Sequence, residues 1–174
     1  IPSKKVSTSS TESTSKWTRI ERPLPLPKYV REAIQQLDEA GWVAYVVGGS
    51  VRDDFLKRPV KDYDIATNAD PDTLCALFPQ AITVGKTFGV IKVPISEGVM
   101  LEIATFREDV DVNDHRHPAS VRFGDVEEDA SRRDFTINAL YYDVKTQRVL
   151  DLTGGLEDLK SKRLRAIGDP MERF

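Results

Sequence analysis

Asp62 and Asp64, separated by one tyrosine, are the residues of this chain best suited to chemistry. Successive side chains of a β-strand face opposite sides, so we expect both carboxylates on one face while Tyr63 and Ile65 turn toward a core. Two carboxylates on one face can bind Mg²⁺, which completes its shell with water and phosphate oxygens. The pair therefore predicts a two-metal site for phosphoryl transfer. Because Asp-x-Asp also occurs by chance in turns and on solvated strand edges, the prediction needs support from other segments.

A glycine turn upstream gives that support. Residues 43–47 are predicted to form a buried strand and residues 50–57 a helix. The turn between them consists of Gly48, Gly49 and Ser50. Glycines let a backbone approach a ligand closely, and free amides at the start of a helix favour phosphate, so we expect this turn to bind a nucleotide. Arg52 can add a bidentate grip on a triphosphate. The alternative is a plain tight turn in which Arg52 pairs with Asp53 on the surface.

Four motifs follow one another along the chain in a fixed order. They are Gly-Gly-x-Val-Arg-Asp at 48–53, Lys-Asp-x-Asp-x-Ala-Thr at 61–67, Glu-x-Ala-Thr-Phe-Arg at 102–107 and Arg-Arg-Asp-Phe-Thr-Ile-Asn-Ala at 132–139. Together they resemble the head domain of the bacterial-type (class II) CCA tRNA nucleotidyltransferase and poly(A) polymerase family. The resemblance covers roughly residues 42–174, and four ordered motifs are far more specific than any one of them.

The resemblance implies a polymerase-β-like nucleotidyltransferase that adds nucleotides from ATP and CTP to RNA 3′ ends without a template. CCA addition to tRNA is the first expectation and polyadenylation the alternative. The resemblance also assigns site residues: Asp62 and Asp64 to two Mg²⁺ ions, Gly49, Arg52 and Arg133 to the incoming nucleotide, Asp134 to the acidic residues of the site, and Asn138 to the asparagine of the last motif.

The Arg-Arg-Asp motif is predicted to lie on a helix over residues 127–137. Adjacent helical positions point about 100° apart, so Arg132 and Arg133 are not expected to face one ligand together. One of them should be structural or face RNA. Asp134 and Asn138, at i and i+4, share a helix face and can line the site together.

Glu102 interrupts a run of residues that otherwise predicts a buried strand. A charge in such a place is costly unless it is paired or bound to metal. Glu102 is either a third acidic residue beside the metals or the partner of a basic side chain such as Arg107, and the sequence does not decide between them.

The predicted site needs no covalent nucleophile, because positioning and electrostatics carry phosphoryl transfer. His115 and His117 are expected in a polar loop that closes near the nucleotide or the RNA end. A zinc site there is disfavoured, since the single cysteine, Cys75, lies in a predicted helix over residues 71–78.

Composition limits the partners and the compartment. The 174 residues carry a net charge of −3, and the one dense basic run is residues 160–165, whereas a self-sufficient RNA-binding protein needs clustered cations. One cysteine excludes an internal disulfide and suits a reducing compartment. No apolar segment is long enough to cross a membrane. We therefore expect a cytoplasmic protein; its oligomeric state stays open.

The order of the predicted elements indicates an α/β (α+β mixed) domain with a mixed sheet flanked by helices, since several strands follow one another without a helix between. Besides the elements already named, strands are expected near 61–66, 81–84, 89–95, 99–106, 139–144 and 148–152, and a helix over 29–40. Residues 1–27 are expected to be a flexible tail and Pro-rich arm, and residues 28–174 the head domain, cut off at the start of a helical neck.

Other functions stay open. A nucleotide-binding module without turnover and a metal-dependent phosphohydrolase are compatible with the same carboxylate pair. Family members carry their base-selecting residues in the neck, which would lie beyond Phe174. The chain by itself is therefore expected to be weakly active or inactive, with little choice between ATP and CTP.

Overall fold

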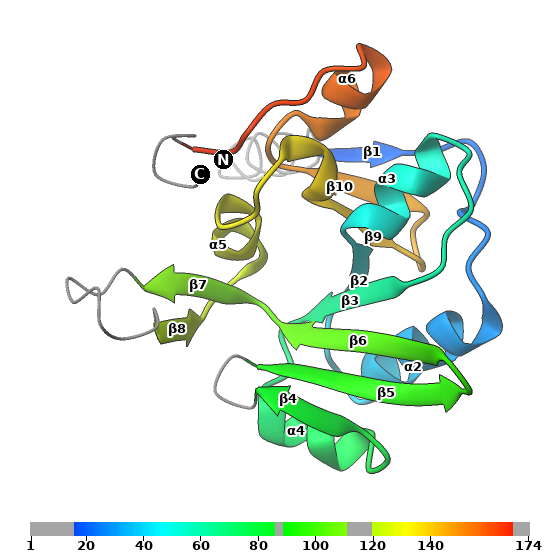
Figure 1. The fold of residues 1–174 in the computed structure, drawn as a ribbon, viewed down its shortest axis with the longest axis vertical. Coiled ribbons are helices and arrows are strands. Elements are labelled where there is room, and N and C mark those ends of the chain that lie inside the picture. The colour runs from blue at the N-terminus through cyan, green and yellow to red at the C-terminus, as the bar shows by residue number, and fades with distance from the viewer. Residues whose placement is uncertain (1–15, 86–88, 111–119, 169–174) are drawn as a thin grey trace, which may run out of the picture.

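A mixed eight-stranded sheet forms the frame of the molecule (Figure 1), in a computed structural model that describes residues 16–85, 89–110 and 120–168. The strand order is β1-β10-β9-β2-β3-β6-β5-β4. Its strands are β1 (Trp17–Arg19), β2 (Ala44–Val47), β3 (Tyr63–Thr67), β4 (Ile82–Gly85), β5 (Val90–Ser96), β6 (Val99–Thr105), β9 (Leu140–Asp143) and β10 (Arg148–Asp151). The pair β3–β6 is parallel, and the other neighbouring strands are antiparallel. The mixed sheet expected from the sequence is confirmed.

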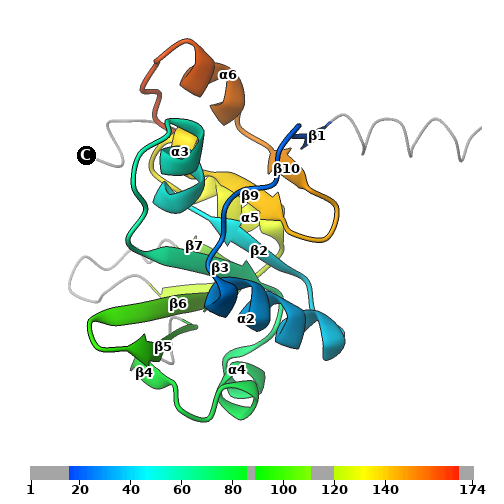
Figure 2. The same ribbon diagram turned by 90° about the vertical axis from the view of Figure 1, so that its right-hand side faces the viewer.

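A separate two-stranded sheet continues from the end of β6 (Figure 1). It consists of β7 (Arg107–Val110) and β8 (Ser120–Phe123). The helices are α2 (Lys28–Glu39), α3 (Gly49–Phe55), α4 (Pro71–Leu77), α5 (Val126–Ser131), the short 3₁₀ helix η2 (Thr136–Asn138) and α6 (Gly155–Lys160). In two views at right angles, α3 and α6 lie at the end of the molecule opposite α4 (Figure 2).

Two hydrophobic clusters occupy the two faces of the sheet. The larger one contains the buried sides of α2 and α4 packed on alternate residues of the central strands, such as Ile65 and Ile103. The smaller one lies on the opposite face and includes Ala66, Phe106 and Tyr141. Successive residues of a strand therefore belong to different faces of the sheet. Asp64 and Glu102 lie on the same face as the smaller cluster.

The helix predicted over residues 127–137 is too long. α5 ends at Ser131, and the backbone at Phe135 is extended, with φ −122° and ψ 149°. The Asp134 carboxylate accepts a hydrogen bond from the Phe135 amide at 2.6 Å, and Phe135 forms an isolated β-bridge with Ala166. A short acidic side chain that bonds nearby amides competes with helix formation, and here a distant segment pairs with the freed backbone.

Part of the region expected to be a tail and arm belongs to the sheet. β1 pairs with β10, and residues 23–27 pack on the domain, with the Leu26 amide donating to the Leu24 carbonyl at 2.8 Å. Leu26 is buried, and the Leu24 amide donates to the Tyr142 hydroxyl at 3.3 Å. These contacts could not be predicted from local patterns because they join segments far apart along the chain. Residues 1–15, expected to be flexible, lie outside the described residues.

Helix α6, which the sequence analysis did not predict, holds η2 in place. The Asp151 carboxylate accepts hydrogen bonds from three amides at the start of α6, those of Gly154, Gly155 and Leu156. The Thr136 hydroxyl donates to the buried Asp158 carboxylate at 2.6 Å. Gly155 lies so close to the Thr136 backbone that an added Cβ would overlap its carbonyl oxygen. The close approach of α6 thus depends on a residue without a side chain.

We expect Gly155→Ala to lower the free energy of unfolding by about 1 to 3 kcal/mol, because the methyl group has to push η2 away from α6. Urea unfolding followed by circular dichroism measures this loss. Lys160→Ala, at an exposed position of the same helix, is the control and should change stability by less than about 0.5 kcal/mol. Equal stability of the two variants would contradict the proposed packing.

Candidate active site

The acidic centre is set by strand pairing. Asp64 on β3 is in register with Glu102 on β6, so their side chains project from the same face of the sheet on neighbouring strands. A hydrogen bond joins the two carboxyl groups. Asp62, one residue before β3, is exposed, and its charge acts on Asp64. Glu102 thus lies beside Asp64, and a role beside metal ions stays a prediction.

The pKa of Asp64 is raised to about 6, from an ordinary value of 3.8. Burial is the largest cause, followed by the negative charge of Glu102 and the hydrogen bond with it. Arg133 acts in the opposite direction and lowers the pKa, and Asp62 raises it further. Two carboxyl groups this close cannot both ionise easily, so the pair retains a proton until a cation or a higher pH removes it.

The glycine turn fits closely around this centre. Gly48 has a φ of +83°, and a Cβ there would lie 3.3 Å from a carboxylate oxygen of Asp64. A Cβ on Gly49 would lie 3.0 Å from the guanidinium of Arg52. Both glycines therefore make room for site residues. The side chain of Ser50, the third residue of the turn, is buried and donates to the Val47 carbonyl at 3.3 Å. That it binds a nucleotide stays a prediction.

Arg52 links α3 to η2. Its Nη1 donates to Asn138 Oδ1 at 2.8 Å, and its Nε donates to Asp53 Oδ1 at 3.0 Å. Arg52 therefore pairs with Asp53, as the alternative expected, and it also lies next to the other residues of the predicted site. Asn138 in turn donates to Asp134 Oδ1 at 3.1 Å. Asp134 is exposed and joins the site through Asn138, so its membership of the catalytic group stays a prediction, as do the nucleotide contacts of Arg52 and Asn138.

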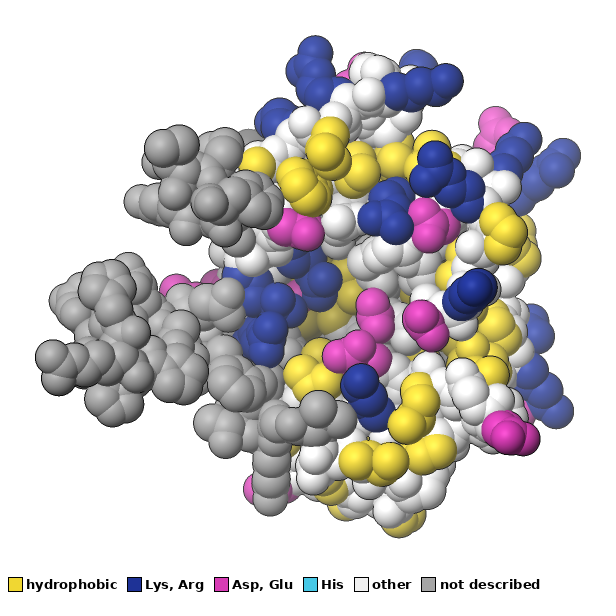
Figure 3. All heavy atoms as spheres, viewed as in Figure 1, with side chains coloured by type: hydrophobic (Ala, Val, Ile, Leu, Met, Phe, Trp, Pro, Cys, Tyr) yellow, Lys and Arg dark blue, Asp and Glu magenta, His cyan; other side chains and the backbone are white. Residues whose placement is uncertain are grey.

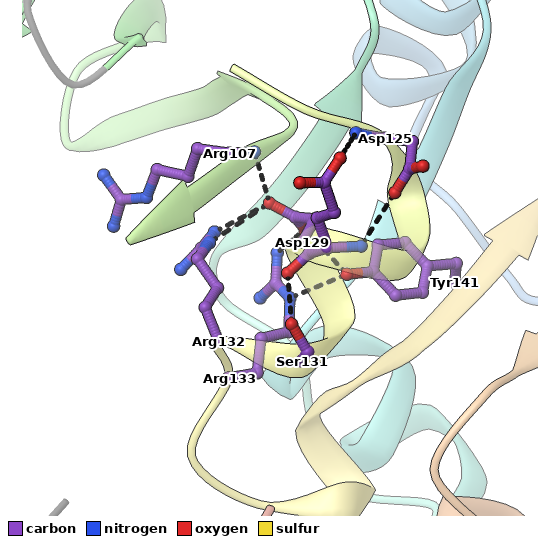
Figure 4. A network of polar contacts seen from close by, with 8 residues as sticks. Arg107, Asp125, Asp129, Ser131, Arg132, Arg133 and Tyr141 are labelled. Carbon is purple, nitrogen blue, oxygen red and sulfur yellow. Dashed lines mark hydrogen bonds and ion pairs between the residues drawn. The ribbon is translucent and has the colours of Figure 1, made fainter. Parts of the chain in front are cut away.

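A buried carboxylate, Asp129, organises the other side of the site (Figure 4). Arg132 donates to Asp129 Oδ1 at 3.2 Å, and Arg133 donates to Oδ2 at 3.0 Å. The Tyr141 hydroxyl also donates to Oδ2, at 2.6 Å, and the Arg107 amide donates to Oδ1 at 3.1 Å. One carboxylate of α5 therefore fixes the two arginines that follow the helix, the first backbone amide of β7 and a side chain of β9.

Arg132 and Arg133 both contact the Asp129 carboxylate, and the expectation that they do not face one ligand together stays a prediction. Because α5 ends at Ser131, neither arginine is inside the helix, and both fold back to a residue three or four positions earlier. Arg133 also donates to the Tyr141 hydroxyl at 3.1 Å. Its expected contact with the nucleotide stays a prediction; its charge does reach Asp64.

Sequence reasoning missed Asp129 and Tyr141. Burial alone would raise the pKa of Asp129, but Arg133, Arg132 and the hydrogen bond from Tyr141 outweigh it and hold the pKa below its ordinary value. The pKa of Tyr141 is raised, mainly by burial. An acidic residue three and four positions before an arginine pair is a signal that could have identified Asp129, whereas Tyr141 is brought in only by strand β9.

The surface of the site carries both signs of charge. In Figure 3, acidic side chains gather near the middle of the face, with Lys and Arg side chains around them. A cavity of about 340 Å³ adjoins the carboxylates and is lined by Gly49, Ser50, Asp53, Pro59, Val60, Lys61, Asp62 and Asp64. A cavity of similar size, about 330 Å³, lies beside α2 and β2, but it lacks the paired carboxylates and the arginine grip, so it is not the chemical centre.

The acidic residues form a sparse set of metal ligands. Within the described ranges, no three His, Cys, Asp or Glu side chains are close enough to enclose an ion. Asp62 and Asp64 nevertheless supply hard oxygen donors on one side of an open cavity, which suits a cation that takes its other ligands from water and phosphate. These donors could therefore hold a divalent metal ion.

The histidines, the cysteine and the lengths of the helices were also the subject of predictions. His115 and His117 lie outside the described residues. Cys75 is a free cysteine in α4, as the sequence predicted. None of the helices in the described part of the chain is long and apolar enough to span a membrane.

The raised pKa of Asp64 predicts a pH-dependent stability in metal-free buffer. The folded protein holds a proton on Asp64 up to about pH 6, whereas the unfolded chain loses it near pH 4. The free energy of unfolding should therefore fall as the pH rises from about 4 to about 6, relative to Asp64→Asn, by on the order of 2 kcal/mol. Urea unfolding of both proteins across this range tests the prediction. A constant difference between them would contradict the raised pKa.

Asp129→Asn should lower the free energy of unfolding by about 3 to 5 kcal/mol, because it leaves Arg132 and Arg133 partly buried without their counter-charge. Thermal and urea unfolding measure the loss. Glu127→Gln is a matched control on the same helix, since its ion pair with Lys16 is exposed and should contribute little. If both variants lose equally little stability, Asp129 does not organise this region.

Comparison with known proteins identifies the family. Residues 44–165 match the family described as the poly A polymerase head domain. The CCA-adding enzymes of Bacillus licheniformis and Streptococcus pyogenes serotype M5 are 44% and 50% identical to the chain, each over 81% of it and 35% of the relative. The Bacillus stearothermophilus CCA-adding enzyme in complex with CTP is similar in structure, with a TM-score of 0.72 and 39% identity over 86% of this chain and 36% of that one. The chain thus spans about a third of the length of these relatives. It belongs to the poly A polymerase head-domain family.

Proposed function

We propose that this chain is the catalytic head of a template-independent RNA nucleotidyltransferase that adds CTP- and ATP-derived nucleotides to the 3′ end of tRNA. The observation that carries the proposal is the Asp64–Glu102 pair, which lies beside the glycine turn that opens the helix of Arg52. The relatives named CCA-adding enzymes support CCA addition over polyadenylation. The proposed head includes the region from Trp17, because β1 completes the sheet.

Two Mg²⁺ ions held by Asp62 and Asp64 would activate the RNA 3′ hydroxyl and offset the charge of the pyrophosphate leaving group. Deprotonation of Asp64, which has a raised pKa, prepares it as a ligand, and metal affinity should therefore increase as the pH rises through about 6. Glu102 adds negative charge beside these two ligands. The protein thus supplies the anionic centre and needs no covalent nucleophile.

In this proposal, Arg52 and Arg133 position the substrate. Arg52 is held by Asp53 and Asn138, so its guanidinium is oriented before a triphosphate arrives. A preoriented cation loses less side-chain freedom on binding than a free one does. Arg133, held by Asp129 and Tyr141, keeps positive charge near Asp64 from the other side. In this proposal Asp134 and Asn138 act as positioning residues for Arg52.

The test uses the full-length protein, a tRNA lacking its 3′ CCA, Mg²⁺, CTP and ATP. The wild type should add C, C and A, and Asp64→Asn should lower the rate by about 10²-fold or more, because it removes charge from the reacting centre. Glu39→Gln, at an exposed position on α2, is the control and should retain full activity.

Other products would overturn the proposal. Addition of many adenylates and no cytidylate would indicate a poly(A) polymerase. Phosphate release from nucleotides without RNA extension would indicate a phosphohydrolase. Binding of Mg²⁺-ATP, measured by calorimetry, without either reaction would indicate a nucleotide-binding module.

A further inference from the structure

A lysine continues the row of charged residues that contains the acidic centre. Lys92 on β5 is in register with Glu102 on β6, which is in register with Asp64 on β3. Residues in register project from the same face, so the three side chains form a line across neighbouring strands. The neighbours of Lys92 along β5, Ile91 and Val93, are buried on the other face and fix this orientation.

The acidic centre thus has cations on two sides. On the β2 side lie the glycine turn and Arg52, which is fixed by Asn138. On the β5 side lies Lys92, which is only partly buried. Because β3 and β6 separate β2 from β5 in the sheet, Arg52 and Lys92 lie on opposite sides of the two carboxylates.

Exposed apolar side chains border Lys92. Ile82 on β4 is in register with Lys92 and is 50% exposed. Met100, two residues before Glu102 on β6, is 39% exposed and projects from the same face. A cation next to exposed apolar surface can bind a phosphate and pack against the attached sugar or base at the same time.

Phosphoryl transfer needs the attacking and leaving oxygens roughly in line. If the triphosphate is held on the Arg52 side, its pyrophosphate leaves toward that side, and the RNA 3′ hydroxyl has to arrive from the β5–β6 side. We propose that Lys92 binds the phosphodiester group next to the 3′-terminal nucleotide of the RNA primer. This inference rests on the proposed function and assigns the two sides of the centre to two substrates.

The competing role for Lys92 is to balance the charge of Glu102 across the strand pair. Glu102 is already hydrogen-bonded to Asp64, and the two roles predict different measurements. A primer contact affects RNA binding and its salt dependence. A charge-balancing role affects the pH profile of the reaction and leaves the salt dependence of RNA binding unchanged.

The experiment compares wild type, Lys92→Gln and Lys92→Arg in the full-length protein, with tRNA lacking its CCA end. Lys92→Gln should raise the KM for RNA and the Kd measured by fluorescence anisotropy roughly fivefold, and reduce the slope of log Kd against log salt by about one. The KM for CTP should stay the same. Lys92→Arg should restore most of the RNA affinity, since it keeps the charge.

Lys28→Gln is the matched control, because Lys28 is a highly exposed lysine on α2. An unchanged salt slope, or equal increases in the KM for RNA and for CTP, would overturn the assignment of Lys92. If the wild type binds RNA with the expected salt dependence but adds no nucleotides, the proposed function fails and the anisotropy measurement still decides the role of Lys92.

Discussion

The molecule is built around an unfavourable contact, two carboxyl groups held side by side by the pairing of β3 with β6. Backbone hydrogen bonds of the parallel pair fix the spacing of the two backbones, so both side chains start from neighbouring positions on one face. The next residues on the same strands, Ile65 and Ile103, are buried on the opposite face and keep the pair in register. The hydrophobic core thus keeps two acidic side chains close together, whereas in a solvated loop they could move apart.

Compensation for this charge comes from segments that are distant in sequence. Arg133 lowers the pKa of Asp64 and is itself fixed by Asp129 and Tyr141. Arg52 meets Asn138 across 86 residues. Arg52 pairs with Asp53 and Arg133 pairs with Asp129. Both arginines therefore place positive charge in the site without forming an ion pair with Asp64 or Glu102. The separation of anionic and cationic groups is what allows a charged ligand to enter between them.

Local patterns were sufficient for the parts of the site that lie within one strand or turn. The alternation around Asp64 predicted its strand face, and the two glycines predicted the turn before α3, because both depend on neighbouring residues. The end of α5 could not be predicted in this way, since it depends on the Asp134 side chain and on the β-bridge between Phe135 and Ala166. Similarly, the position of Glu102 beside Asp64 depends on the register of two strands, which no single-strand pattern contains.

The contact between α6 and η2 has a consequence for how the protein responds to its ligands. α6 holds Thr136, Thr136 belongs to the same short helix as Asn138, and Asn138 orients Arg52. A ligand that binds only the oriented form of Arg52 stabilises every link in this series by mass action. Local opening of α6 and occupation of the proposed nucleotide site would then be thermodynamically linked, and protection of α6 amides from hydrogen exchange would be a remote measure of ligand binding at that site.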